Sequence, residues 1–189
     1  MLDCAMQSNP KSVEQQIKAA RVLIVDDEYY TRKVIRTLLM ACGVTDIHDA
    51  SEGNAGLEAI RRHAPDIVIL DWEMPGMDGA EFTRQVRSPG SFPYPAVPII
   101  MLTGHGERSR VLEAVRLGVH EFLLKPVSSQ ALMARMVSVL TKPRSMVKRG
   151  DYYGPEPRKL ATYKPGSDSY PLREQQGVDR PSNYVIFVN

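Results

Sequence analysis

The chain has 189 residues, which suffices for one ordinary domain with extensions but not for two full domains. With 43% hydrophobic and 24% charged residues it has the composition of a soluble globular protein, and no apolar run approaches the roughly 20 residues that cross a bilayer. Its net charge of +2 does not argue for a polyanionic partner.

The first 20 residues are predicted to be an N-terminal leader. They lack the basic start and continuous apolar stretch of a secretion signal. Cys4 and Cys42 match no metal or disulfide spacing, and reduced thiols are typical of the cytoplasm. We therefore expect a cytoplasmic protein without a membrane anchor.

Five short apolar runs follow in the body of the chain, at residues 21–26, 46–50, 66–71, 97–103 and 120–125. The runs "RVLIVD", "DIVILD" and "VPIIMLT" are nearly continuous in Val, Ile and Leu, as strands covered on both faces are. The run "DIHDA" is weaker and is predicted to be a strand mainly from its position.

Segments with helical spacing separate these runs, at residues 29–43, 51–63, 79–88, 107–118 and 128–140. Ser51 and Asp78 are expected to cap the second and third of them. The first has a four-residue apolar stripe: Val34, Ile35, Leu38 and Leu39. This alternation predicts one α/β domain over residues 21–141, with a doubly wound parallel sheet and right-handed crossovers.

The tail at residues 142–189 has a different composition. Prolines at 143, 155, 157, 165, 171 and 181 divide it into pieces too short for a second core. The tail contains nine basic and five acidic residues. No output domain is recognisable there. The strand-like run "NYVIFVN" at its end is expected to add to a sheet edge of this chain or of a neighbouring copy.

Polar residues end four of the predicted strands: Asp26 and Asp27, then Asp71, Thr103 and Lys125. Functional sites in such sheets lie beyond the carboxyl ends of the strands. Three close carboxylates repel one another unless a cation intervenes, and Mg²⁺ with its preference for oxygen ligands suits them. Each residue alone has an ordinary structural explanation, but together they predict phosphoryl transfer to an aspartate.

Four stretches resemble the receiver domain of two-component response regulators, and the resemblance spans residues 21–141. They are "VLIVDDE", "DIVILDWEMPGMDG", "IIMLTGHG" and "FLLKPV". The resemblance implies a flavodoxin-like (βα)5 three-layer sandwich with a five-stranded parallel sheet of order 2-1-3-4-5.

The resemblance also implies roles for the acidic residues. Asp71 is expected to be the phosphoacceptor. Mg²⁺ is expected to be held by Asp27 directly, by Asp26 through a water, by Asp71 and by the backbone carbonyl of Glu73. Glu73 and His105 flank the expected acyl phosphate and are expected to influence its lifetime.

Further implied roles concern the phosphoryl group and the switch. Thr103 and Lys125 are expected to bind phosphoryl oxygens, and Thr103 and Phe122 to form the switch. Lys125 and Pro126 are expected to be joined by a cis peptide bond.

By resemblance, a histidine kinase or histidine phosphotransfer protein is the expected phosphodonor and docks on the helix from Tyr29 to Ala41. The fourth helix (107–118), fifth strand and fifth helix are expected to form a face that binds a downstream protein or a second copy. A homodimer through the tail is the other arrangement considered. Beyond self-phosphotransfer and autodephosphorylation, no enzyme activity is expected.

Two alternatives stay open from the sequence. The first is a DNA-binding transcriptional regulator, because "MVKRGDYYGPEPRK" in the tail is basic with interleaved tyrosines, although scattered basic residues are more typical of a solvated extension. The second is a phosphohydrolase with an aspartate nucleophile, for which no second acid–base group or substrate-covering cap is evident.

Overall fold

The computed structural model describes residues 12–104, 108–157, 160–162 and 185–187. The chain divides into two compact units, Met1–Glu156 and Pro157–Asn189, and each is described by itself. None of the helices in the described ranges is both long and apolar enough to traverse a bilayer.

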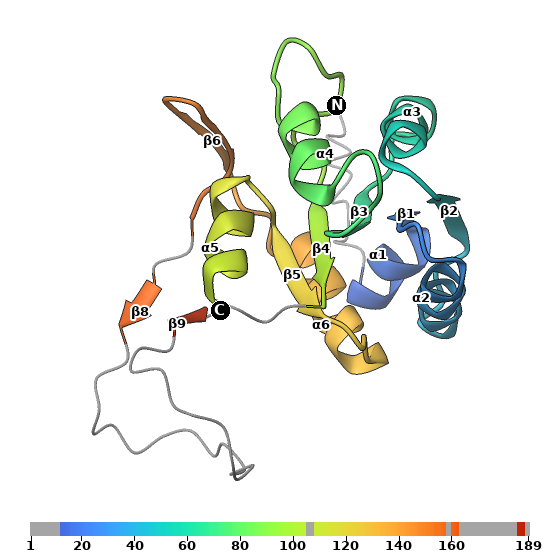
Figure 1. Cartoon of the computed structure of the whole chain (residues 1–189). Coiled ribbons are helices and arrows are strands. Elements are labelled where there is room, and N and C mark those ends of the chain that lie inside the picture. Colours follow the sequence, from blue (N-terminus) through green and yellow to red (C-terminus); the bar gives the residue numbers. More distant parts are fainter. Residues whose placement is uncertain (1–11, 105–107, 158–159, 163–184, 188–189) are drawn as a thin grey trace, which may run out of the picture. The chain divides into compact units, whose positions relative to one another are not determined.

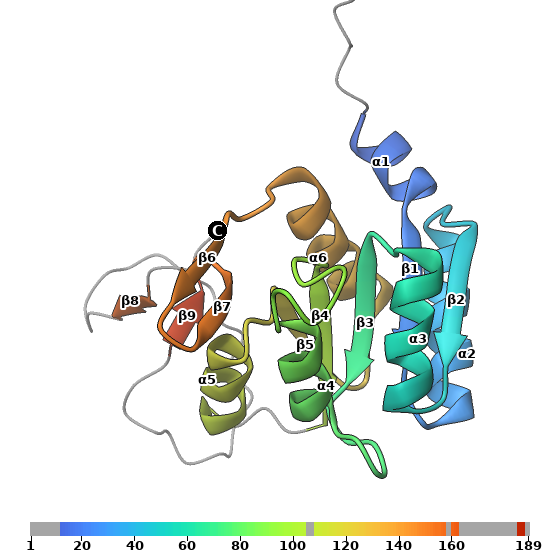
Figure 2. The same cartoon turned by 90° about the horizontal axis from the view of Figure 1, so that it is seen from above.

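The first unit is built on a five-stranded parallel sheet with the order β2-β1-β3-β4-β5, which confirms the predicted topology (Figure 2). The strands are β1 (Arg21–Val25), β2 (Asp46–Ala50), β3 (Ile67–Asp71), β4 (Ile99–Thr103) and β5 (Glu121–Leu124). β2 is an edge strand, which explains why its sequence is less apolar than that of the central strands.

Helices cover both faces of the sheet (Figure 1). α2 (Tyr29–Ala41), α6 (Ser129–Thr141) and the N-terminal α1 (Val13–Ala19) lie on one face. α3 (Gly53–His63), α4 (Gly79–Val86) and α5 (Arg108–Arg116) lie on the other. The fold is therefore the three-layer sandwich that the sequence predicts.

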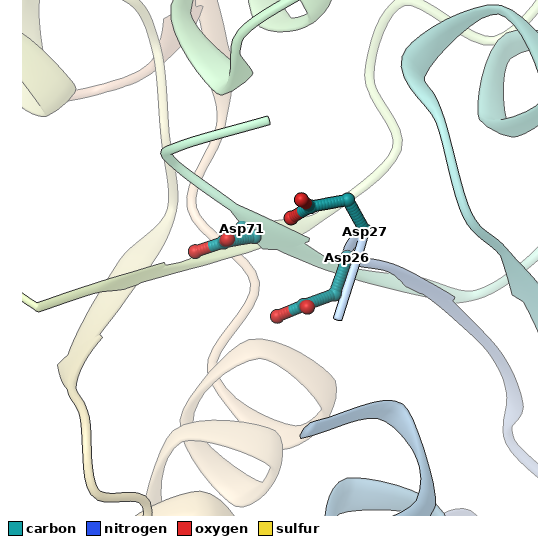
Figure 3. A group of neighbouring side chains, drawn as sticks. All are labelled: Asp26, Asp27 and Asp71. Atoms are coloured by element: carbon teal, nitrogen blue, oxygen red, sulfur yellow. The ribbon is translucent and has the colours of Figure 1, made fainter. Parts of the chain in front are cut away.

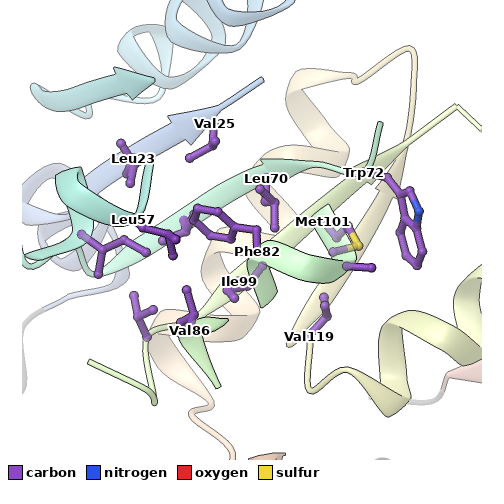
Figure 4. Close-up of a cluster of buried hydrophobic side chains, with 14 of the residues drawn as sticks. Leu23, Val25, Leu57, Leu70, Trp72, Phe82, Val86, Ile99, Met101 and Val119 are labelled. Carbon is purple, nitrogen blue, oxygen red and sulfur yellow. The ribbon is translucent and has the colours of Figure 1, made fainter. Parts of the chain in front are cut away.

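The core beneath α3, α4 and α5 is centred on Phe82, which is fully buried (Figure 4). Alternate residues of the central strands, such as Leu70 and Ile99, point into this cluster, and their neighbours Ile69 and Ile100 point into the opposite one. All residues of β3 and β4 are buried as a result. This burial holds the ends of these strands, and the polar residues on them, in fixed positions.

Two local predictions are wrong. Ser51 does not cap α3, which begins at Gly53 with Glu52 at the N-cap position and no side-chain cap. Val34 does not belong to the buried stripe of α2, because it is 53% exposed while Ile35 and Leu39, four residues apart, face the sheet.

α1 lies within the predicted leader and was not expected from the sequence. Ser12 and Gln15 form a reciprocal capping box at its start, with the Gln15 backbone N–H donating to Ser12 Oγ at 3.3 Å. Ile17 is 5% exposed and packs in the cluster between the sheet and α6. This helix therefore extends the core at its N-terminal end.

The tail contributes a β-hairpin to the first unit, formed by β6 (Met146–Arg149) and β7 (Tyr152–Pro155). Gly150, with φ +57°, occupies the tight turn between the strands. The hairpin contacts the loop after α5: a Cβ on Gly154 would lie 2.6 Å from the Gly118 Cα, and Arg144 donates to the His120 carbonyl.

In the second unit, β8 (Leu160–Thr162) pairs antiparallel with β9 (Val185–Phe187). β9 confirms the strand expected in "NYVIFVN". Among the residues described in this unit, its partner is β8, rather than the sheet edge that the sequence analysis favoured.

Candidate functional site

Three carboxylates meet at the carboxyl end of the sheet. Asp26 and Asp27 directly follow β1, and Asp71 ends the neighbouring strand β3. One carboxylate oxygen of each lies within 4.8 Å of those of the other two, and Figure 3 shows the three side chains around one small space. The predicted cluster is thus formed in space.

Lys125 places an ammonium group between two of these carboxylates. Its Nζ lies 3.0 Å from Asp26 Oδ2 and 2.9 Å from Asp71 Oδ1. Asp26 and Asp71 are 0% and 4% exposed, whereas Asp27 is exposed. Lys125 therefore pairs with the two buried carboxylates of the three.

Burial raises the pKa of Asp71, and repulsion by Asp26 acts in the same direction, while Lys125 lowers it in part. Burial alone would lower the pKa of Lys125, but its hydrogen bonds to Asp71 and Asp26 outweigh this and raise it. With all groups ionised, three carboxylates and one ammonium leave two negative charges uncompensated. A hard divalent cation such as Mg²⁺ fits this all-oxygen set.

Main-chain contacts hold the acidic turn after β1. The Glu28 N–H donates to Asp26 Oδ1 at 2.9 Å, and Arg32 Nη1 donates to the carbonyls of Asp26 and Asp27 at 2.8 and 3.0 Å. Sequence reasoning missed Arg32, because an arginine in the first turns of a helix carries no signal of its carbonyl partners.

Close backbone packing holds the other side of the site. The Gly79 N–H donates to the Trp72 carbonyl at 2.8 Å, and a Cβ on Gly79 would lie 2.5 Å from the Asp71 carbonyl oxygen. Only glycine allows this approach of α4 to the end of β3. Asp78 caps α4, as predicted, by accepting from the Glu81 N–H at 2.7 Å.

Thr103 and Phe122 lie on the two strands beyond β3. Thr103 ends β4 and is 4% exposed, and its carbonyl accepts from the Lys125 N–H at 2.8 Å. The Lys125–Pro126 peptide bond is cis, as expected. Phe122 on β5 is half-buried and packs against the core beneath α3, α4 and α5.

Glu73 is exposed in the loop after β3, two residues past Asp71. His105 lies outside the described residues, so the structure does not place it.

A cleft of about 460 Å³ opens beside the acidic cluster, with Asp27 in its wall. Its lining residues are Asp27, Trp72, Glu73, Met74, Pro75, Asp78 and Arg110. The Arg110 guanidinium carbon lies 5.0 Å from the centre of the Trp72 ring, a cation–π arrangement. Sequence reasoning missed both residues, because they are 38 positions apart and only the fold brings them together.

The fold and the acidic cluster at its strand ends define a protein class, and the family comparison agrees. The family model of the response regulator receiver domain matches residues 22–137. The chain belongs to this family. It is accordingly a response regulator of the two-component type.

Among individual relatives, the chain is 30% identical over 122 residues to the chemotaxis protein CheY of Pseudomonas aeruginosa, covering 65% of this chain and 97% of the relative. The solved structure of CheY4 from Vibrio cholerae matches with a TM-score of 0.59 and 30% identity, over 64% of this chain and 98% of the other. A CheX–CheY–BeF3–Mg²⁺ complex from Borrelia burgdorferi matches with a TM-score of 0.58 and 28% identity, over 64% of this chain and 88% of that one.

Proposed function

We propose that this response regulator is switched by transfer of a phosphoryl group to Asp71 from a histidine kinase or a histidine phosphotransfer protein. The observation that supports this most directly is the position of Lys125, whose ammonium group lies within 3.0 Å of both Asp26 and Asp71. A lysine in that position can bind a phosphoryl oxygen as soon as Asp71 carries the group.

An Asp71 oxygen forms the new bond to phosphorus while the bond from phosphorus to the histidine nitrogen breaks, and that nitrogen keeps the electron pair. Lys125 and the Thr103 hydroxyl bind phosphoryl oxygens. Asp26, Asp27, Asp71 and the Glu73 carbonyl would hold Mg²⁺, which supplies positive charge to stabilise the phosphoryl oxygens during transfer. Glu73 and His105 influence how long the acyl phosphate survives.

The switch follows from the place of Thr103 at the end of β4. A phosphoryl group on Asp71 attracts the Thr103 hydroxyl, and Phe122 on the neighbouring strand β5 then moves inward. The face formed by α5, β5 and α6 changes shape and binds a downstream protein or a second copy. CheY of Borrelia burgdorferi is found in complex with a second protein, CheX, which supports a protein as binding partner.

α2 is the proposed docking surface for the phosphodonor protein. Tyr29, Tyr30 and Val34 are 60%, 73% and 53% exposed beside the acidic turn. Exposed apolar and aromatic side chains on one helix suit a protein partner. We place the protein in the cytoplasm, where such donors act, and propose the turnover of its own acyl phosphate as its only chemistry.

Incubation with acetyl phosphate and Mg²⁺ tests the proposal. Mass spectrometry should find one added phosphoryl group, on Asp71, and chelation of the metal or Asp71→Ala should abolish it. Stoichiometric labelling with slow loss supports a switch, whereas turnover of many equivalents would indicate a phosphohydrolase. Labelling of the Asp71→Ala variant at the same pocket would refute the assignment of the acceptor.

A further inference from the structure

We propose that Arg110 determines which small phosphodonors this receiver accepts, and that it favours acyl phosphates, whose leaving group is a carboxylate. This inference rests on the proposed function of Asp71. It concerns the cleft beside the acidic cluster, in which Arg110 has no role in the assignments above.

The cleft is the place where a leaving group would lie. In phosphoryl transfer the attacking and leaving oxygens are roughly in line with phosphorus between them, so the leaving group points away from Asp71. Asp27 belongs to both the acidic cluster and the cleft wall, and Trp72 and Glu73 directly follow the acceptor. A donor bound at the acidic cluster therefore extends into this cleft.

The charges in the cleft make Arg110 important for an anionic donor. The seven lining residues include three carboxylates, on Asp27, Glu73 and Asp78, and Arg110 is the one lysine or arginine among them. Without a cation there, these carboxylates would repel a departing carboxylate. Arg110 supplies a guanidinium, which can bind a carboxylate through two parallel hydrogen bonds.

Two contacts position Arg110. Its guanidinium lies over the ring of Trp72, which is 3% exposed, at 5.0 Å from guanidinium carbon to ring centre. Its Nη1 lies 3.8 Å from Glu113 Oε2, an ion-pair distance longer than a hydrogen bond. The buried ring restricts where the guanidinium can lie, while the long contact with Glu113 leaves it able to bind another carboxylate.

The chemistry of two small donors separates this role from a structural one. With acetyl phosphate, an Asp71 oxygen bonds to phosphorus, the bond from phosphorus to the acyl oxygen breaks, and acetate leaves with the electron pair and its negative charge. With phosphoramidate, the phosphorus–nitrogen bond breaks, and the nitrogen, already carrying three protons, leaves as neutral ammonia. A guanidinium therefore stabilises the departure of acetate, which is negatively charged, but not that of neutral ammonia.

The test measures rates of Asp71 labelling by intact-mass spectrometry, with the full chain, Mg²⁺ and each donor in turn. Arg110→Met, which keeps much of the packing over Trp72, should slow labelling by acetyl phosphate about tenfold and labelling by phosphoramidate less than about twofold. Arg110→Lys keeps the charge but not the paired hydrogen bonds and should give an intermediate rate with acetyl phosphate. Arg116→Met, at an exposed position of the same helix and outside the cleft lining, is the matched control and should change neither rate.

The outcomes distinguish this inference from the proposed function. If the unaltered protein is labelled by neither donor, the proposed function fails. If it is labelled by both, and Arg110→Met slows both equally or neither, Asp71 remains the acceptor and the role of Arg110 is refuted. Thermal unfolding of each variant shows whether the fold is retained, and Arg110→Lys provides the comparison if Arg110→Met unfolds.

Discussion

At the scale of single residues, Arg87 is a buried guanidinium that bonds to main-chain carbonyls. It donates to Gly118, Pro95 and Val97 at 2.7–2.9 Å, and burial lowers its pKa to about 9. Its Nη2 also lies 3.2 Å from His120 Nδ1. These bonds join the end of α4 to the segments before β4 and β5.

His120 is held in its neutral form by the same network. Its Nδ1 accepts from Arg87 Nη2 and from the Ile99 N–H, so this nitrogen carries no proton. Burial and then the nearby positive charges of Arg87 and Arg144 lower its pKa to about 2 from the ordinary 6.5. The folded protein therefore resists a proton that the unfolded chain accepts.

Acid should destabilise the protein through His120. Between the unfolded pKa of 6.5 and the folded value of about 2, His120 takes up a proton when the protein unfolds. His120 therefore does not lower the free energy of unfolding above pH 6.5, and it lowers that free energy increasingly as the pH falls. The slope of the free energy of unfolding against pH that is due to His120 approaches about 1.4 kcal/mol per pH unit. His120→Asn retains an acceptor for Arg87 and should lose this part of the pH dependence. Urea unfolding of both proteins at pH 7, 6, 5 and 4 measures it, and parallel curves would contradict the prediction.

At the scale of elements, the hairpin β6–β7 extends the receiver beyond α6. Gly118 and Gly154 bring the two backbones into direct contact, and a Cβ on Gly118 would lie 2.7 Å from the Tyr153 carbonyl oxygen. Gly154 and Pro155 are buried. The hairpin is thus fitted to the corner between α5 and β5, at the end of β5 away from Lys125.

Gly154→Ala should destabilise the hairpin contact. The new Cβ would lie 2.6 Å from both the Gly118 Cα and the Tyr152 hydroxyl, so the backbones must move apart. We expect the free energy of unfolding to fall by about 1–3 kcal/mol, as in other overpacked sites. Chemical denaturation measures this. Lys148→Ala, at an exposed position of the same hairpin, is the control and should have little effect.

At the scale of the whole molecule, the two units suggest different responses to truncation. A chain ending at Glu156 retains the complete first unit and should unfold with unchanged stability. A chain ending at Thr141 loses the hairpin and the bond from Arg144 to the His120 carbonyl, and should be less stable by about 2 kcal/mol. Thermal and urea unfolding of both chains test this, and equal stability of the two would show that the hairpin adds nothing.

The sheet and the acidic cluster could be predicted from the sequence because their signals are local. β1, β3 and β4 are buried on both faces and so read as continuous apolar runs, and parallel topology brings the residues at their ends together. α1 was missed because its signal is one short capping box. The contacts of Arg32, Arg110 and the hairpin could not be predicted, because each depends on partners that only tertiary packing selects.

Trp72 is the one tryptophan in the chain, and it directly follows the proposed acceptor. Its indole is shielded from solvent and lies beneath a guanidinium on α5. Light absorbed at the red edge of the aromatic band is therefore emitted from beside Asp71 alone. The fluorescence of Trp72 should therefore change when a metal ion or a phosphoryl group binds at the acidic cluster, and this change can be followed in real time without an attached dye.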